Sequence, residues 1–209
     1  MEVNYEMVKT KIFEYGDKEI NYLKNADQLL GATIERIGKI DRIIIPELFP
    51  ALVYAIIGQQ ISLKAAKTIW GRMQEHWEDI TPEHMATASI DDIRACGMQG
   101  TKAKYIKGIG ETIAKGEFDL EELYTLPDKE AIEKLSSLNG IGEWTAEMLL
   151  LNCMERPNII SYGDIAIRRS IMKLYALTEL NKEQFTVYKN RYSPYASVAS
   201  IYLWKLSYE

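Results

Sequence analysis

Apolar residues recur along this chain mostly three and four positions apart, which is the spacing of amphipathic α-helices. No stretch alternates apolar and polar residues for long enough to predict a strand. Capping residues, glycines and prolines divide the pattern into short helices and turns. The expected helices are residues 17–26, 27–37, 47–59, 62–77, 89–95, 101–115, 119–125, 127–137, 142–154, 164–175, 181–190 and 193–206. The pattern therefore predicts an all-α protein.

One expected helix, residues 47–59, is apolar on almost every side. A helix that has no polar face is typical of the centre of a helical domain. We therefore expect it to be buried, with the other helices packed around it.

The composition is that of an ordinary globular protein, with 47% hydrophobic residues. No apolar run approaches the roughly 20 residues that span a bilayer, and the N-terminus lacks a signal-peptide profile. Cys96 and Cys153 are the two cysteines, too few for a disulfide framework or a four-cysteine metal site. We expect a cytoplasmic protein without a catalytic metal and without a membrane partner.

The formal net charge of −5 argues against a nucleic-acid partner when it is taken alone. Seven acidic residues against two lysines in residues 117–134 account for all of it, so the rest of the chain is balanced. A local basic face is therefore possible, although a solvated helix face is the simpler interpretation of any single lysine. The candidates for a basic face are Lys64, Lys67, Lys102, Lys104, Lys107, Arg168, Arg169 and Lys173.

Two glycines around one apolar residue, Gly140-Ile141-Gly142, predict a tight turn between two helices. Backbone amides at the start of the second helix would point outward, which makes an anion site that needs no basic side chain. The alternative is a helical hairpin whose glycines serve only close packing. A single aspartate, Asp164, stands before a later helix, where it is either a plain N-cap, a fixed carboxylate with a chemical role, or both.

Four segments, in this order, resemble the helix–hairpin–helix DNA glycosylases, and within them the 3-methyladenine DNA glycosylase II branch. They are Phe49–Ala66 with its Gly-Gln-Gln turn, Leu138–Leu151, Gly163–Arg169 and Ser193–Trp204. The resemblance implies two helical subdomains with the active site in the cleft between them. Residues 47–160 would form a helical barrel containing the hairpin, and residues 1–46 would pack with a C-terminal subdomain of residues 161–209.

The resemblance implies a monofunctional glycosylase that hydrolyses the N-glycosidic bond of alkylated purines during base excision repair. Its partner would be double-stranded DNA with damaged bases, and we expect a monomer. Asp164 would be catalytic, because a carboxylate can stabilise the positive charge that develops on the sugar and orient the attacking water. A cationic alkylpurine departs without an acid, so one carboxylate would suffice.

An extruded base needs a pocket, and aromatic faces suit a cationic base. Trp144 and Tyr195 are the main candidates and Tyr54 is a weaker one, although any aromatic residue can equally be core or surface. Tyr162 and Tyr192 are also weaker candidates, whereas Trp70, Trp77 and Trp204 are expected in the core.

An extruded base leaves a gap in the base stack, which an inserted side chain can fill. Met98 and Gln99, at a turn, are the candidates for this intercalating role. Gln59 and Gln60 end the buried helix and should approach the same gap. As alternatives, the glutamines satisfy helix-end carbonyls and Met98 belongs to the core.

The hairpin residues expected to bind the DNA backbone are Asn139, Gly140, Ile141, Gly142 and Thr145. By resemblance, a structural monovalent cation could be bound at Leu138 and Gly140, and no other cofactor is expected.

The chain departs from the family pattern at three places. Bifunctional relatives have a lysine where Trp144 stands, so no abasic-site lyase activity is expected. The acidic pair of the family is reduced to Gly163-Asp164, and Tyr195-Ala196 replaces a tryptophan and arginine, which leaves the preferred lesion open. The alternatives are a glycosylase for oxidised or deaminated bases, a non-catalytic DNA-binding module, and a helical protein-interaction domain.

Overall fold

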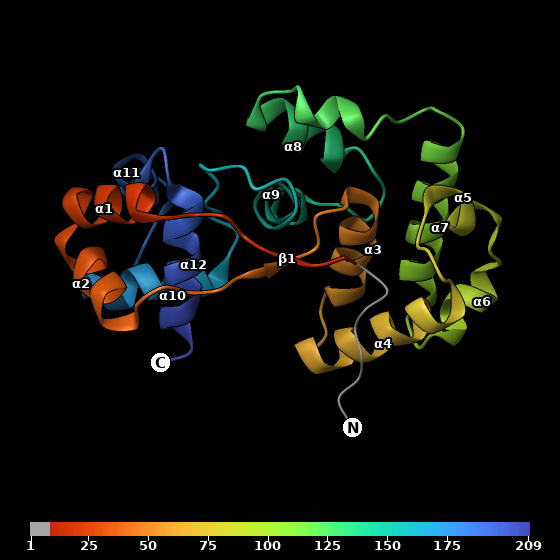
Figure 1. The fold of residues 1–209 in the computed structure, drawn as a ribbon, viewed down its shortest axis with the longest axis horizontal. Helices are drawn as coiled ribbons and strands as arrows, with labels where there is room; N and C mark the ends of the chain where they lie inside the picture. Colours follow the sequence, from red (N-terminus) through yellow and green to blue (C-terminus); the bar gives the residue numbers. More distant parts are fainter. Residues whose placement is uncertain (1–8) are drawn as a thin grey trace. The chain divides into compact units, whose positions relative to one another are not determined.

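The computed structural model describes residues 9–209, and helices supply nearly all of its regular structure (Figure 1). The prediction of an all-α protein is confirmed. Within the described residues, the exception is a two-stranded pairing of β1 (Lys11–Ile12) with β2 (Ile43–Ile44). The chain divides into two compact units, one containing residues 45–149 and the other containing residues 12–44 and 150–209.

The first unit is built around one buried helix, as the sequence predicts. Leu52, Val53, Ile56 and Ile57 of that helix have no exposed side-chain surface, and the helix packs against α4 and α7. The elements that begin in this unit are α3 (Leu48–Gly58), α4 (Leu63–His76), α5 (Pro82–Thr87), α6 (Ile90–Ala95), α7 (Gly100–Ala114), the 3-10 helix η1 (Glu121–Tyr124), α8 (Asp128–Ser136) and α9 (Glu143–Asn152).

Helix α5 is absent from the sequence prediction. Thr81 caps it by accepting a hydrogen bond from the amide of His84, and Pro82 occupies its first turn. Six residues are too few to show a helical period, so these two residues were its only signal.

The second unit consists of α1 (Asp17–Ala26), α2 (Gln28–Ile37), α10 (Ile165–Leu174), α11 (Lys182–Tyr192) and α12 (Ala196–Ser207). Helix α12 is buried along most of its length and packs against α10, while α1 packs against α2. The unit therefore joins N-terminal and C-terminal helices around α12.

Residues 150–160 cluster with this second unit, whereas the sequence interpretation placed them in the first. The reason is a set of hydrogen bonds to two buried serines of α12. The hydroxyl of Ser197 accepts from the amide of Ile159 at 2.9 Å, and the hydroxyl of Ser200 donates to the Ile159 carbonyl at 3.0 Å. The amide of Ser197 also donates to the Pro157 carbonyl at 3.0 Å. Side chains far along the sequence thus set this boundary.

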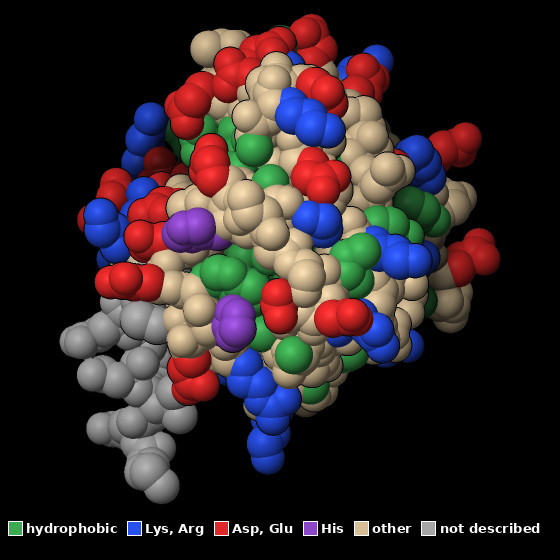
Figure 2. Space-filling model, turned by 90° about the vertical axis from the view of Figure 1, so that its right-hand side faces the viewer, with side chains coloured by type: hydrophobic (Ala, Val, Ile, Leu, Met, Phe, Trp, Pro, Cys, Tyr) green, Lys and Arg blue, Asp and Glu red, His purple; other side chains and the backbone are tan. Residues whose placement is uncertain are grey.

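Among residues 9–209, no helix combines the length and the apolar character that crossing a bilayer requires. Charges on the face in Figure 2 are mixed, with acidic side chains gathered along the upper edge and basic ones projecting below.

Candidate functional site

The expected turn between two helices is present between α8 and α9. The amide of Ile141 donates to the Leu138 carbonyl at 3.0 Å and closes the turn. The side chain of Ile141 is 4% exposed, so it anchors the turn in the core. The amide of Ala146 then donates to the Gly142 carbonyl at 2.9 Å, which starts α9. Amides before this bond have no partner within an ideal helix, so they define the outward-facing end of α9.

The two glycines of this turn serve different purposes. Gly140 has a φ of +92°, and a Cβ on it would lie 2.4 Å from Cδ2 of Tyr105. Gly140 is therefore required by backbone conformation and by packing inside the protein. A Cβ on Gly142 would meet no atom within 4 Å, so the space beside the start of α9 is open. Close internal packing explains the first glycine and does not explain the second.

Gln59 ties the turn to the end of α3. Its Nε2 donates to the Gly140 carbonyl at 2.9 Å and lies 3.5 Å from Oγ1 of Thr145. Nζ of Lys102 donates to the carbonyls of Ile57 at 2.8 Å and of Gln59 at 2.5 Å. Helix end, turn and hairpin therefore form one hydrogen-bonded cluster within the first unit.

This cluster corrects the prediction that Lys102 belongs to a basic face. The side chain is 8% exposed, and burial lowers its pKa. Lys107 also has partners inside the protein, because its Nζ donates to the carbonyls of Ala86 and Ala88. Both lysines satisfy carbonyls at the ends of helices.

In the second unit, Asp164 holds a fixed orientation at the start of α10. Its Oδ1 accepts from the amide of Ile167 at 3.0 Å, which is the N-cap bond, and its Oδ2 accepts from Nε1 of Trp204 at 3.1 Å. Asp164 is 7% exposed. Both oxygens accept a hydrogen bond, so the side chain is oriented from two directions.

Trp204, which the sequence pattern places in the core, is half-buried, and sequence spacing does not predict its hydrogen bond to Asp164. Its ring is also covered by the guanidinium of Arg42, whose Cζ lies 4.8 Å from the ring centroid. Nε and Nη2 of Arg42 both donate to Oδ1 of Asn152, at 3.1 and 3.0 Å. The one available signal was general: a half-buried indole N–H needs an acceptor.

The aromatic candidates fall in different surroundings. Trp144, in the first turn of α9, is 44% exposed. Tyr54 is half-buried, edge-on to Trp70 at 5.4 Å between centroids. Tyr195 precedes α12 and meets Tyr22 edge-on at 5.2 Å. Trp144 and Tyr54 belong to the first unit, and Tyr195 belongs to the second with Asp164.

The two weaker tyrosine candidates have structural partners. Tyr192 has no exposed surface, and its hydroxyl is hydrogen-bonded to that of Tyr175 at 2.8 Å, so it is a core residue. The ring of Tyr162 is covered by the guanidinium of Arg168 at 5.0 Å.

Met98 is 7% exposed, which places it in the core. A side chain packed there would have to leave the core before it could enter a base stack, so the structure favours the alternative interpretation of this residue. Gln99 and Gln60 are exposed, and Gln60 has a φ of +57°. A left-handed conformation at a residue other than glycine is uncommon and concentrates at functional sites.

A model of the HhH-GPD superfamily base excision DNA repair proteins matches residues 53–191. DNA-3-methyladenine glycosylase 1 of Schizosaccharomyces pombe is 31% identical over 166 residues, which cover 77% of this chain and 73% of that protein. A DNA-3-methyladenine glycosylase of Bacillus subtilis is 28% identical over 199 residues, and the match covers 89% of this chain but 66% of that protein.

A solved structure of the S. pombe 3-methyladenine DNA glycosylase in complex with abasic DNA has a similar fold. Its TM-score is 0.81 at 28% sequence identity, and the match covers 92% of this chain and 97% of that one. The similarity extends over both compact units.

Proposed function

Because this chain belongs to the HhH-GPD superfamily of base excision DNA repair proteins, we propose that it hydrolyses the N-glycosidic bond of alkylated purines in DNA. The product would be an abasic site. The fixed Asp164 carboxylate carries this proposal, and the names of the two relatives, both 3-methyladenine glycosylases, support the substrate class.

Asp164 would act on the deoxyribose. Breaking the glycosidic bond leaves positive charge on the sugar, which a carboxylate can stabilise if it is already oriented. The Ile167 amide and the Trp204 indole N–H supply this orientation from two directions. The carboxylate can also orient the attacking water, while a cationic alkylpurine leaves without protonation.

The hairpin would bind the DNA backbone through main-chain amides. The open space beside Gly142 supports this role, because nothing in the protein prevents a phosphate from approaching the backbone there. Asn139, Ile141 and Thr145 complete the proposed contact, and the S. pombe relative that binds abasic DNA supports DNA as the partner.

Trp144, Tyr54 and Tyr195 are proposed to contact the extruded base, and Gln59, Gln60 and Gln99 to approach the gap. Trp144 is 44% exposed in the first turn of α9, and an indole ring can stack on a base. Because Trp144 also stands where a Schiff-base lysine would be, we propose that the chain has no abasic-site lyase activity.

A monovalent cation at the hairpin remains compatible with the turn. The carbonyl oxygens of Leu138 and Gly140 each accept one hydrogen bond, from Ile141 N and Gln59 Nε2. A carbonyl oxygen has a second lone pair, so both could contribute to a cation's coordination.

The test is base release from duplex DNA treated with a methylating agent, measured as strand breaks after hot alkali. Wild-type protein should produce alkali-dependent breaks, and Asp164→Asn should lose them while retaining binding to an abasic duplex. Asparagine preserves the N-cap bond but loses the bond from the Trp204 indole N–H, because its amide nitrogen cannot accept. The melting temperature should therefore fall modestly, and retained duplex binding shows that the variant is folded. Asp17→Asn makes the same change on an exposed residue at the start of α1 and should behave as wild type.

Three results would contradict the proposal. Release of neutral oxidised or deaminated bases without release of alkylated ones would point to a different substrate class. Unchanged turnover in Asp164→Asn would remove the proposed catalytic role. Strand breaks without alkali would show a lyase activity.

A further inference from the structure

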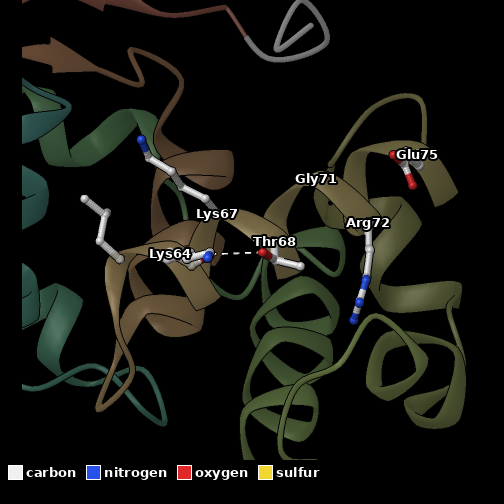
Figure 3. A pocket seen from close by; sticks show the side chains of 7 residues that line it. Lys64, Lys67, Thr68, Gly71, Arg72 and Glu75 are labelled. Carbon is white, nitrogen blue, oxygen red and sulfur yellow. Dashed lines mark hydrogen bonds between the residues drawn. The ribbon is translucent and has the colours of Figure 1, made fainter. Parts of the chain in front are cut away.

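One side of α4 presents basic side chains to solvent. Lys64, Lys67 and Arg72 are all exposed. At 3.6 residues per turn, Lys67 and Arg72 each lie within about 80° of Lys64 around the helix axis and about 140° from each other. Figure 3 shows them around a hollow whose lining also includes Thr68, Gly71 and one acidic residue, Glu75. Neither lysine forms an ion pair with any carboxylate in residues 9–209, and Arg72 makes one long hydrogen bond, 3.4 Å, to the Cys96 carbonyl.

These lysines oppose the electrostatics of their own helix. The N-terminal end of a helix carries partial positive charge, and acidic residues are favourable there. Helix α4 has no acidic residue in its first turn, a feature it shares with α2, α3, α7, α10 and α12, and it carries Lys64 there. Ser62 caps α4 through the amide of Ala65. Unlike Lys102 in the first turn of α7, which donates to two carbonyls inside the protein, Lys64 is exposed.

Some lysines of the same unit have partners inside the protein: Lys102 and Lys107 donate to backbone carbonyls, and Lys134 pairs with Glu122. Lys104 and Lys115 are exposed and form no ion pair within residues 9–209, as is true of the two α4 lysines. What distinguishes the α4 lysines is that they line one hollow together with Arg72.

The start of α4 lies close to the hairpin. Gln59 is hydrogen-bonded to Gly140, and Lys64 follows Gln59 by five residues. Five residues span at most about 17 Å, so the Lys64 backbone lies within that distance of Gln59. Over about 17 Å of axis each strand of a DNA duplex carries roughly five phosphates, so one strand segment can reach both places.

We infer that Lys64 and Lys67, together with Arg72, bind DNA backbone phosphates as a second contact outside the hairpin. That the bound polyanion is DNA rests on the proposed function. Because the contact reaches phosphates alone, it strengthens binding equally on damaged and undamaged duplexes.

The experiment measures duplex binding by fluorescence anisotropy between 50 mM and 400 mM salt. It compares wild type with Lys64→Gln/Lys67→Gln and with the control Lys115→Gln/Lys129→Gln, which removes two exposed lysines of the same unit. Each lost phosphate contact lowers the slope of log affinity against log salt by about 1, so the α4 variant should lose about 2. If the α4 variant and wild type bind equally at 1 M salt, a slope difference of about 2 makes the variant bind roughly 100-fold more weakly at 0.1 M salt.

The loss should be equal on damaged and undamaged duplexes, and the rate of base release at saturating protein should match wild type. Glutamine is a good helix former and the removed charges oppose the helix dipole, so the melting temperature should stay equal or rise. A slope equal to that of the control would overturn the inference even if base release is normal. If the α4 variant has a reduced slope but the wild type releases no base, the phosphate contact on α4 would be supported and the proposed function would be contradicted.

Discussion

The two hairpin glycines should respond to alanine in opposite ways, because the protein packs against one of them and not the other. At Gly140, the new Cβ would lie 2.4 Å from Cδ2 and 2.6 Å from Cγ of Tyr105. Moving that ring costs about 1–3 kcal/mol. The φ of +92° adds about 1–2 kcal/mol for a residue with a side chain. Gly140→Ala should therefore lower the free energy of unfolding by about 2–5 kcal/mol.

At Gly142, no atom lies within 4 Å of the new Cβ, and φ is outside the left-handed region. The same substitution should be neutral or stabilising by up to about 1 kcal/mol, since alanine restricts the unfolded chain. If DNA phosphate approaches this backbone, the methyl group displaces a charge-assisted hydrogen bond of about 1.5–3 kcal/mol. Binding to an abasic duplex should then weaken by about 10- to 100-fold.

Urea unfolding measures the first effect and fluorescence anisotropy with an abasic duplex measures the second. A double-mutant cycle with Tyr105→Ala separates the two costs at Gly140, because removing the ring relieves the clash and leaves the φ cost. The coupling should be about 1–3 kcal/mol.

Either glycine can refute its part of the reasoning. Wild-type stability of Gly140→Ala would mean that the turn does not pack on Tyr105 as described. Wild-type DNA affinity of a folded Gly142→Ala would mean that the backbone at Gly142 is not a phosphate contact.

Two further predictions concern buried polar groups. Lys102→Met removes both hydrogen bonds to the Ile57 and Gln59 carbonyls and should lower the free energy of unfolding by about 2–4 kcal/mol in urea titrations. Burial lowers the pKa of Lys102, so the unfolded state binds more protons than the folded state as pH nears the ordinary value of 10.5. The free energy of unfolding of wild type relative to Lys102→Met should therefore rise with pH. A difference that stays constant with pH would contradict the burial of this amine. Trp204→Phe removes the indole donor to Asp164 and should slow single-turnover base release by about 10-fold or more without changing DNA affinity, whereas an unchanged rate would limit the indole to packing.

Helices were predictable from the sequence wherever a period of 3.6 residues extended over two turns and a capping residue preceded it. Ser62, Ser89 and Asp164 each accept the backbone hydrogen bond that their position suggested. Helices α5 and α6 have six residues each and show no period, and only α6 was predicted, from its cap Ser89. The Thr81-Pro82 start of α5 is an equivalent local signal. For helices this short, a capping residue is therefore the only local evidence.

Tertiary partners were not predictable, because they join residues that are distant in sequence. Asp164 was identified as a candidate from local context, but its second donor, Trp204, comes from 40 residues away on another helix. Lys102 and Lys104 stand two positions apart on α7, so they face different directions. Lys102 is buried against α3 and Lys104 is exposed, a distinction that lysine spacing alone does not reveal.

The hairpin shows how distant residues set a local geometry. Its glycines permit the turn, but Gln59 fixes the Gly140 carbonyl from the end of another helix, and Lys102 fixes the Gln59 carbonyl in turn. Without Gln59 and Lys102, the same glycines would still permit the turn, but the Gly140 carbonyl would no longer be held in one direction. The orientation of the turn is therefore a property of the first unit as a whole, and the proposed phosphate contact would depend on the buried amine of Lys102 as well as on the glycines.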